Sequence, residues 1–177
     1  TFSVEVYEDR MQKLHVSYHT LEDQSYPQLL KAIKNPPFVL YTKGDITAYA
    51  TTDSLIAVVG SRKITAYGTQ VTELLVKDLV AAGFTIISGL ALGVDAVSHM
   101  TALENNGSTI AVLGCGVDVI HPVVNTALYW EIIRKAGLVV SEYPLGQYAL
   151  KGLFPARNRI ISGLSLGVIV VEASRNS

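Results

Sequence analysis

Five short apolar runs recur along the chain, and their regular spacing is the feature that most limits its fold. They end in small or polar residues and occupy "LIAVVGS" (55–61), "FTIISG" (84–89), "TIAVLG" (109–114), "LVVSE" (138–142) and "GVIVVEAS" (167–174). Their starts lie between 25 and 29 residues apart. Helical stretches are predicted between them, at about 65–82, 94–105, 123–136 and 155–164. Strand followed by helix at about 30 residues per unit is typical of βαβ units. The sequence therefore predicts a doubly wound α/β fold with a mostly parallel sheet.

Right-handed crossovers bring the carboxyl ends of such strands to one edge of the sheet. We expect small residues to line this edge, where they would let a ligand approach the backbone and the helix N-termini. These residues are Gly60, Ser61, Ser88, Gly89, Gly114, Gly116, Ser141 and Ser174.

The first part of the chain, residues 1–54, has a different pattern and is predicted to be an extension packed on the sheet of 55–177. It contains "YPQLLKAI" (26–33), predicted as a short helix, and "NPPFVLYTKG" (35–44). Two prolines block helix there, so "FVLYTK" is predicted as an added edge strand. Five of the fifteen acidic residues fall in the first 23 positions, which makes this segment a poor surface for nucleic acid.

Composition narrows the class of protein further. The chain is 49% hydrophobic and 16% charged, with a net charge of −1, so any phosphate binding must be local. The single cysteine, Cys115, excludes an intramolecular disulfide and fits a cytoplasmic location. No apolar run approaches the roughly 20 residues of a membrane span. The chain opens on Thr1 and stops directly after an apolar run, so we expect a piece of a longer protein, truncated at its C-terminal end.

Motifs for dinucleotide or ATP chemistry are missing. The first strand leads into "GSRKITAYG", which is not the G-x-G-x-x-G fingerprint, and "GCGVDV" has Val119 at the third glycine position. Ser88 stands where an acidic residue would hold a ribose. No Walker A sequence is present either. No cofactor is predicted.

Two further patterns suggest enzymes but fit them poorly. "GLSLG" (163–167) matches the G-x-S-x-G pattern of hydrolases, yet Ser165 follows a helix where that motif needs a strand turning into a helix. Asp95 and His99 have the spacing of metal ligands on a helix, but no third ligand joins them. We interpret Asp95 as holding the first turn of its helix and His99 as making a polar contact, and we predict no metal site.

A basic turn, "FPARNRIISGLS" (154–165), is the strongest chemical signal. Arg157 and Arg159 are predicted to fall in the first turn of a helix, beside the positive end of its dipole, where cations are misplaced. They suit an anion. Between Tyr143 and Val171 the chain has three cations and no acid. Arg62, Lys63 and Arg175 are expected to add to this positive charge, and Phe154 is either a stacking platform for a base or a core residue.

A polyanion site without a convincing acid, base, nucleophile or metal favours binding over catalysis. Three hypotheses remain open at this point: a non-catalytic binder of single strands, an enzyme or sensor for a small nucleotide, and a scaffold whose basic pocket stabilises a dimer.

With these residues in place, the sequence resembles the DprA family, also called Smf, of bacterial DNA-processing proteins. The resemblance rests above all on "AVVGSRKITAYG", "ISGLALGVDAVSH" and "FPARNRIISGLS", in that order. It implies an extended Rossmann-like fold over 55–177 and a homodimer that is not an enzyme. It also implies that single-stranded DNA is bound and protected, and that the recombinase RecA is loaded onto it during natural transformation.

The resemblance also assigns the DNA-binding residues. They are Gly60, Ser61, Arg62, Ser88, Gly89, Lys151, Phe154, Arg157, Asn158 and Arg159. One departure from the family lies nearby, because His121-Pro122 follows "GVDVI" where the family usually has Tyr-Pro. The nucleotide-hydrolysing relatives of the wider fold group carry a PGG-x-GT segment, which is absent here.

Overall fold

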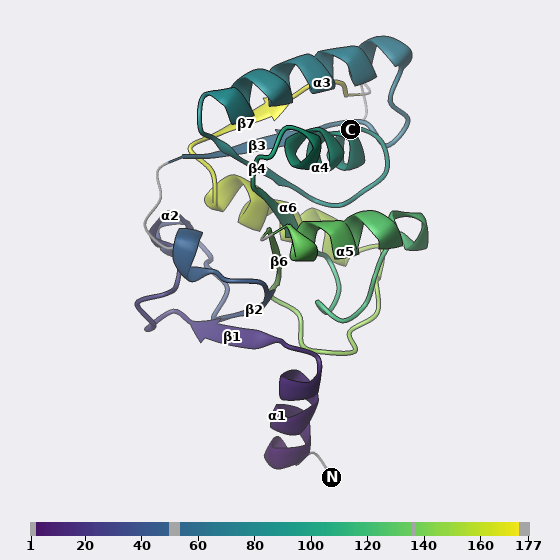
Figure 1. Cartoon of the computed structure of the whole chain (residues 1–177). Coiled ribbons are helices and arrows are strands. Elements are labelled where there is room, and N and C mark those ends of the chain that lie inside the picture. The colour runs from purple at the N-terminus through teal and green to yellow at the C-terminus, as the bar shows by residue number, and fades with distance from the viewer. Residues whose placement is uncertain (1–2, 50–53, 136, 174–177) are drawn as a thin grey trace.

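A seven-stranded sheet with helices on both faces forms the body of the protein (Figure 1). The computed structural model describes residues 3–49, 54–135 and 137–173. The strand order is β1-β2-β6-β5-β4-β3-β7. The five predicted strands are all present: β3 (Leu55–Val59), β4 (Thr85–Ser88), β5 (Thr109–Val112), β6 (Leu138–Ser141) and β7 (Gly167–Val170). Each pairs in parallel with its neighbours among these five, which confirms the doubly wound fold.

Helices follow the strands as the spacing predicts. They are α3 (Ala66–Ala81), α4 (Val94–Glu104), α5 (Thr126–Arg134) and α6 (Leu153–Gly163), with a short 3-10 turn, η2 (Val123–Asn125), before α5. Thr65 caps α3, and its side chain accepts a hydrogen bond from the Gly68 amide at 3.0 Å. The chain runs from β3 to β6 in one direction along the sheet and then crosses back to β7, which pairs with the free side of β3. Because both crossovers are right-handed, α6 lies on the face opposite α4 and α5.

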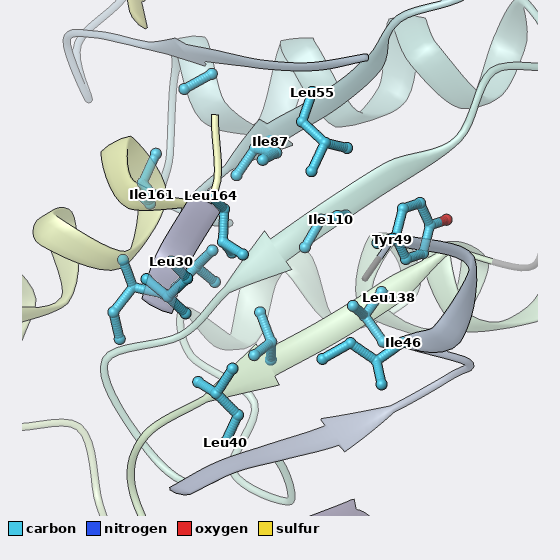
Figure 2. Packing of buried hydrophobic residues seen from close by; sticks show 14 of the residues in the cluster. Leu30, Leu40, Ile46, Tyr49, Leu55, Ile87, Ile110, Leu138, Ile161 and Leu164 are labelled. Atoms are coloured by element: carbon cyan, nitrogen blue, oxygen red, sulfur yellow. The ribbon is translucent and has the colours of Figure 1, made fainter. Parts of the chain in front are cut away.

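The core lies on both faces of the sheet because neighbouring residues of each strand point in opposite directions. Ile110 packs with Leu30, Ile161 and Leu164 on one face (Figure 2). Ala111, the next residue, packs with the helices of the other face. Strands buried on both faces carry continuous apolar runs, which made β3, β4, β5 and β6 visible in the sequence, whereas β7 carries such a run although Val168 and Val170 are exposed.

The N-terminal extension differs from its prediction. It contains α1 (Val4–Lys13), β1 (Ser17–Thr20), α2 (Gln28–Lys31), β2 (Val39–Lys43) and a 3-10 turn, η1 (Thr47–Tyr49). Strand β2 pairs antiparallel with both β1 and β6, so the prediction that "FVLYTK" forms an edge strand is wrong, and β1 is the edge. The sequence of β1, "SYHT", has no fully buried residue and gave no hydrophobic pattern to read. Helix α1, which protrudes from the sheet in Figure 1, buries only Met11.

The division of the chain into two parts at residue 54 stays a prediction. Leu40 of the extension packs in the same core cluster as Leu55 and Ile110 of the sheet. Among the described residues, no helix is both long and apolar enough to cross a membrane.

Candidate functional site

Three segments meet at the carboxyl edge of the sheet, where the chain order switches between β3 and β7. They are the loop after β3, the loop after β4 and the first turns of α6. A groove of ≈ 620 Å³ lies between them, and ligands of doubly wound folds bind at such switch points. The groove is lined by Gly60, Arg62, Ala91, Asp95, Arg157, Asn158 and Arg159, with parts of β7. The structure brings several of the predicted site residues together at this edge, and their side chains have unequal exposure.

Arg157 is an interior residue, only 4% exposed. Its Nη1 donates hydrogen bonds to the carbonyl oxygens of Gly89, at 2.8 Å, and of Val112. Its Nε donates to Oδ1 of Asn158 at 3.3 Å. Helix α6 begins at Leu153, two residues before its predicted start, so Arg157 falls in the second turn. The expectation that Arg157 lies in the first turn is therefore wrong, and its Nε and Nη1 are bound to protein, whereas its predicted role in binding DNA stays a prediction.

The charge of Arg157 is balanced by Asp95, which is also buried. Burial raises the pKa of Asp95, and the positive charge of Arg157 opposes that shift. Burial likewise lowers the pKa of Arg157, and Asp95 opposes it. Oδ2 of Asp95 accepts hydrogen bonds from the amides of Gly89, at 3.1 Å, and Ala91, at 3.3 Å. Asp95 therefore holds the loop that precedes its helix, a role close to the predicted one.

His99 also binds the loop after β4. Its Nε2 accepts a hydrogen bond from the Leu90 amide at 3.3 Å. Its Nδ1 lies 2.6 Å from Oγ1 of Thr109, whose hydroxyl donates to the carbonyl of Ile86. Nδ1 is therefore the protonated nitrogen of a neutral ring. Burial lowers the pKa of His99 to about 3, with a smaller contribution from the positive charge of Arg157. The predicted polar contact of His99 is confirmed, and both ring nitrogens are occupied by protein.

Asn125, which no sequence signal pointed to, binds the same loop from the start of α5. Its Nδ2 donates to the carbonyls of Leu90, at 2.9 Å, and Ala91, at 3.3 Å. Leu90 has a positive φ of 55°, which costs a side-chain-bearing residue free energy unless its surroundings fix it. We call loop 89–91 together with Asp95, His99, Asn125 and Arg157 the floor. Side chains of the floor bind all six backbone N–H and C=O groups of this loop.

The small residues at this edge make room for protein rather than for a ligand, contrary to expectation. A Cβ atom at Gly89 would overlap the guanidinium of Arg157, and one at Gly114 would lie 3.0 Å from the ring of Phe154. At Gly60 it would lie 2.7 Å from Val94. These glycines permit the close packing of the site itself.

The serines of the edge are equally occupied. Ser88 donates its hydroxyl to the carbonyl of Val58 and Ser141 donates to that of Cys115, each at 2.7 Å. Both serines are fully buried. Ser174 and Arg175 lie outside the described residues.

Arg159 has a carboxylate partner that the sequence count missed. Its Nη1 and Nη2 donate to the two carboxylate oxygens of Glu142, each at 2.6 Å, and its Nε donates to the carbonyl of Asn35 at 3.0 Å. This bond to Glu142 raises the pKa of Arg159. The acid-free segment started at Tyr143, one residue after Glu142, and the fold brings the two charges together.

A second group of cations is exposed. Arg62, Lys63 and Lys151, which we call the rim, have no carboxylate partner among the described residues. The guanidinium of Arg62 lies 5.5 Å from the ring centroid of Phe154. Phe154 is half-buried and its ring centroid also lies 5.5 Å from that of His121. Arg62 thus places free positive charge beside the rings of Phe154 and His121, and exposed Asn158 lines the same groove as Arg62.

Comparisons with known proteins agree on one family. The model of a family described as DNA recombination-mediator protein A matches residues 17–177. Protein Smf of Synechocystis sp. is 45% identical over 96% of this chain and 43% of its own length. The DNA processing protein DprA of Bacillus subtilis is 42% identical over 89% of this chain and 52% of its own length. The chain therefore spans about half the length of the curated relatives it matches.

Two solved structures are similar to the chain as well. DNA processing protein A from Streptococcus pneumoniae superimposes with a TM-score of 0.86 at 39% identity, covering 96% of this chain and 59% of the other. A structure of DNA processing protein A from Helicobacter pylori, described by its single-stranded DNA binding mode, gives a TM-score of 0.80 at 37% identity. It covers 92% of this chain and 73% of the other.

Proposed function

The chain belongs to the DNA recombination-mediator protein A family, and from this membership we propose that it binds single-stranded DNA along the carboxyl edge of its sheet. The observation that carries the proposal is Arg62, an exposed cation without a carboxylate partner among the described residues, whose guanidinium lies 5.5 Å from the ring centroid of Phe154. Exposed Lys63 follows Arg62 in the chain, and exposed Lys151 precedes Phe154 by three residues. Cationic grooves with aromatic platforms are the common design for binding single strands, because phosphates pair with the cations and bases stack on the rings.

Residues of the predicted DNA site take different parts in this proposal. Arg62, Lys151 and Asn158 contact the strand directly, together with Lys63, and Phe154 stacks on a base. Ser88 and Gly89 act from the interior by shaping the loop after β4. Gly60 and Ser61 shape the loop that carries Arg62, in which Oγ of Ser61 accepts a hydrogen bond from the Lys63 amide at 3.1 Å.

We propose that the chain acts by binding and not by catalysis. The nucleophilic groups near the edge are unsuited to reaction. The buried serines donate their hydroxyls to carbonyls, and burial raises the pKa of the Cys115 thiol to about 11, which keeps it protonated at neutral pH.

The partners implied by the family resemblance belong to the same proposal. The whole protein protects incoming DNA in the cytoplasm and loads RecA onto it during natural transformation, as a homodimer. A free nucleotide is the alternative ligand, and the enclosed hollow beside Phe154 measures only ≈ 80 Å³. Pockets for small ligands usually measure about 300–1,000 Å³, a range that excludes this hollow and includes the groove of ≈ 620 Å³, so the choice between strand and mononucleotide rests on the binding experiment.

Fluorescence anisotropy of a labelled dT oligonucleotide, measured at several salt concentrations, tests the proposal. Three rim contacts at about −0.7 each predict a slope of log affinity against log salt of about −2. Arg62→Ala and Lys151→Ala should each weaken binding and make the slope shallower by about 0.7. Arg134→Ala and Lys77→Ala, which remove exposed cations from the far ends of α5 and α3, should leave both quantities unchanged.

Two outcomes would overturn the proposal. One is an affinity for the dT oligonucleotide that does not depend on salt. The other is displacement of the oligonucleotide by an equal concentration of free dTMP, which would assign the edge to a mononucleotide.

A further inference from the structure

A small hollow beside Phe154 has walls that are mostly apolar. Its volume is ≈ 80 Å³, and its sides are formed by Ala91, Leu92, Pro122 and the rings of Phe154 and His121. This volume cannot enclose a nucleotide, but one edge of a planar group can enter it between the two rings and the loop after β4.

Arg157 forms the polar end of this hollow. Its Nη1 and Nε are bound to protein, as described above, whereas its Nη2 makes no hydrogen bond to any described residue. No side-chain nitrogen or oxygen that is fully buried in the described part of the chain lacks a partner. Nη2 is therefore still accessible, and it keeps two N–H donors free in a side chain that is otherwise 96% covered.

The surroundings of Nη2 suit a neutral acceptor better than a phosphate. Asp95 already balances the charge of Arg157, so the attraction for an entering anion comes from Arg62, which lines the outer part of the groove as well as this hollow. A phosphate would also lose its hydration against apolar walls, which is costly without a full set of partners. A carbonyl oxygen or ring nitrogen on the edge of a base carries no such charge, and the flanking rings stack on its plane.

We propose that Nη2 of Arg157 donates a hydrogen bond to an acceptor on the edge of one DNA base, which enters the hollow beside Phe154. This inference rests on the proposed function and assigns Arg157 a base contact, while phosphates pair with the rim. Every DNA base carries at least one such acceptor, so the contact requires no particular sequence. The carbonyls of Gly89 and Val112 and the side chain of Asn158 hold the guanidinium in place before the strand arrives, which limits the entropy lost on binding.

Base isosteres test the proposal on the unaltered protein. We would compare the dT oligonucleotide with one in which 2,4-difluorotoluene replaces each thymine, since this group keeps the shape of thymine and lacks its strong acceptors. The wild-type chain should bind the isostere about tenfold more weakly, as expected for a lost hydrogen bond to a charged donor. The salt slope should stay the same for both oligonucleotides, because no phosphate contact changes.

Variants locate the effect. Arg62→Ala should retain the tenfold ratio while its salt slope becomes shallower. The double variant Asp95→Asn/Arg157→Met removes both buried charges together, so that neither is left alone, and it should bind the two oligonucleotides equally. If this variant does not fold, equal affinity of the wild-type chain for the two oligonucleotides would still overturn the base contact.

The outcomes separate this inference from the function on which it rests. Salt-dependent binding of dT with equal affinity for the isostere would overturn the base contact and leave the function standing. A tenfold ratio that persists in the folded double variant would overturn the assignment to Arg157. Failure of the wild-type chain to bind dT would overturn the proposed function itself.

Discussion

The floor and the rim of the carboxyl edge use the same residue type in opposite ways. Arg157, in the floor, is buried and donates to two backbone carbonyls. Arg62, in the rim, is exposed and has only the ring of Phe154 beside it. Both are arginines next to glycine-rich loops, and in the sequence both signal an anion.

Burial decides which of the two roles an arginine takes. A planar guanidinium has five donors in a fixed fork, and in a buried position the backbone ends of neighbouring strands use them. Gly89 and Val112 follow the paired residues Ser88 and Ala111 at the ends of β4 and β5, so the Arg157 side chain reaches both carbonyls. The same group in water keeps its donors for a ligand. The floor should therefore determine stability and the rim should determine salt-dependent affinity.

Replacing Arg157 should give the largest difference between the two regions. Arg157→Met leaves the Asp95 carboxylate buried without its counter-charge, and breaking a buried pair typically costs about 3–5 kcal/mol of unfolding free energy. Arg62→Met is the matched control, with an expected change within about 0.5 kcal/mol because the side chain is exposed. Urea unfolding followed by circular dichroism measures both. Equal, small losses in the two variants would contradict the division into floor and rim.

Acid should weaken the floor through His99. Its folded pKa of about 3 lies below the unfolded value of about 6.5, so protonation favours the unfolded chain. The stability that the neutral ring contributes is present above pH 6.5 and is lost as the pH falls toward 3. At pH 5 the loss should be about 2 kcal/mol relative to pH 7.5.

His99→Gln, which does not titrate, isolates this contribution. Asp95 titrates with the opposite sign, since its raised pKa makes protonation favour the folded state. Its effect is present in both proteins and cancels in their difference. We expect the unfolding free energy of the wild-type chain to fall more steeply than that of His99→Gln between pH 6.5 and 5. Parallel curves would show that His99 is not buried as described.

The sequence predicted the parallel sheet well because its signal is local. Residues 55–59 and 110–113 are continuous apolar runs, which are typical of strands buried on both faces. Strand β1 and helix α1 carry no such run, since they pack against the molecule on one side or hardly at all. Their absence from the prediction follows from the same principle.

The sequence predicted where the candidate site lies, but not which of its side chains are buried and which are exposed. Glycines and arginines predicted that these segments meet at one edge of the sheet, since chain order and crossover handedness determine where strand ends meet; that this edge is the binding site stays a prediction. Which cation would be free depended on contacts between distant segments, such as Glu142 with Arg159 across 17 residues. Asn125 showed no signal, because its hydrogen bonds to the loop after β4 span 34 and 35 residues.

Arg159 lies between floor and rim, and converting it to a rim residue should produce the smallest effect. Its side chain is 33% exposed and its partner Glu142 is 17% exposed, so the pair is worth at most about 1 kcal/mol of stability. Glu142→Gln keeps the shape of the partner and removes its charge, which leaves Arg159 with an unneutralised cation. A fourth phosphate contact then becomes available, and the salt slope for dT binding should steepen from about −2 to nearly −3.

Glu131→Gln is the matched control for Glu142→Gln. It removes the same charge from another ion pair, with Lys135 at 3.1 Å, at the end of α5 far from the groove. Anisotropy titrations at several salt concentrations should give the wild-type slope for Glu131→Gln and the steeper slope for Glu142→Gln alone. A steeper slope in both would trace the change to overall charge and not to Arg159. An unchanged slope in Glu142→Gln would place Arg159 with the floor, as a residue whose donors stay on the protein even without their carboxylate.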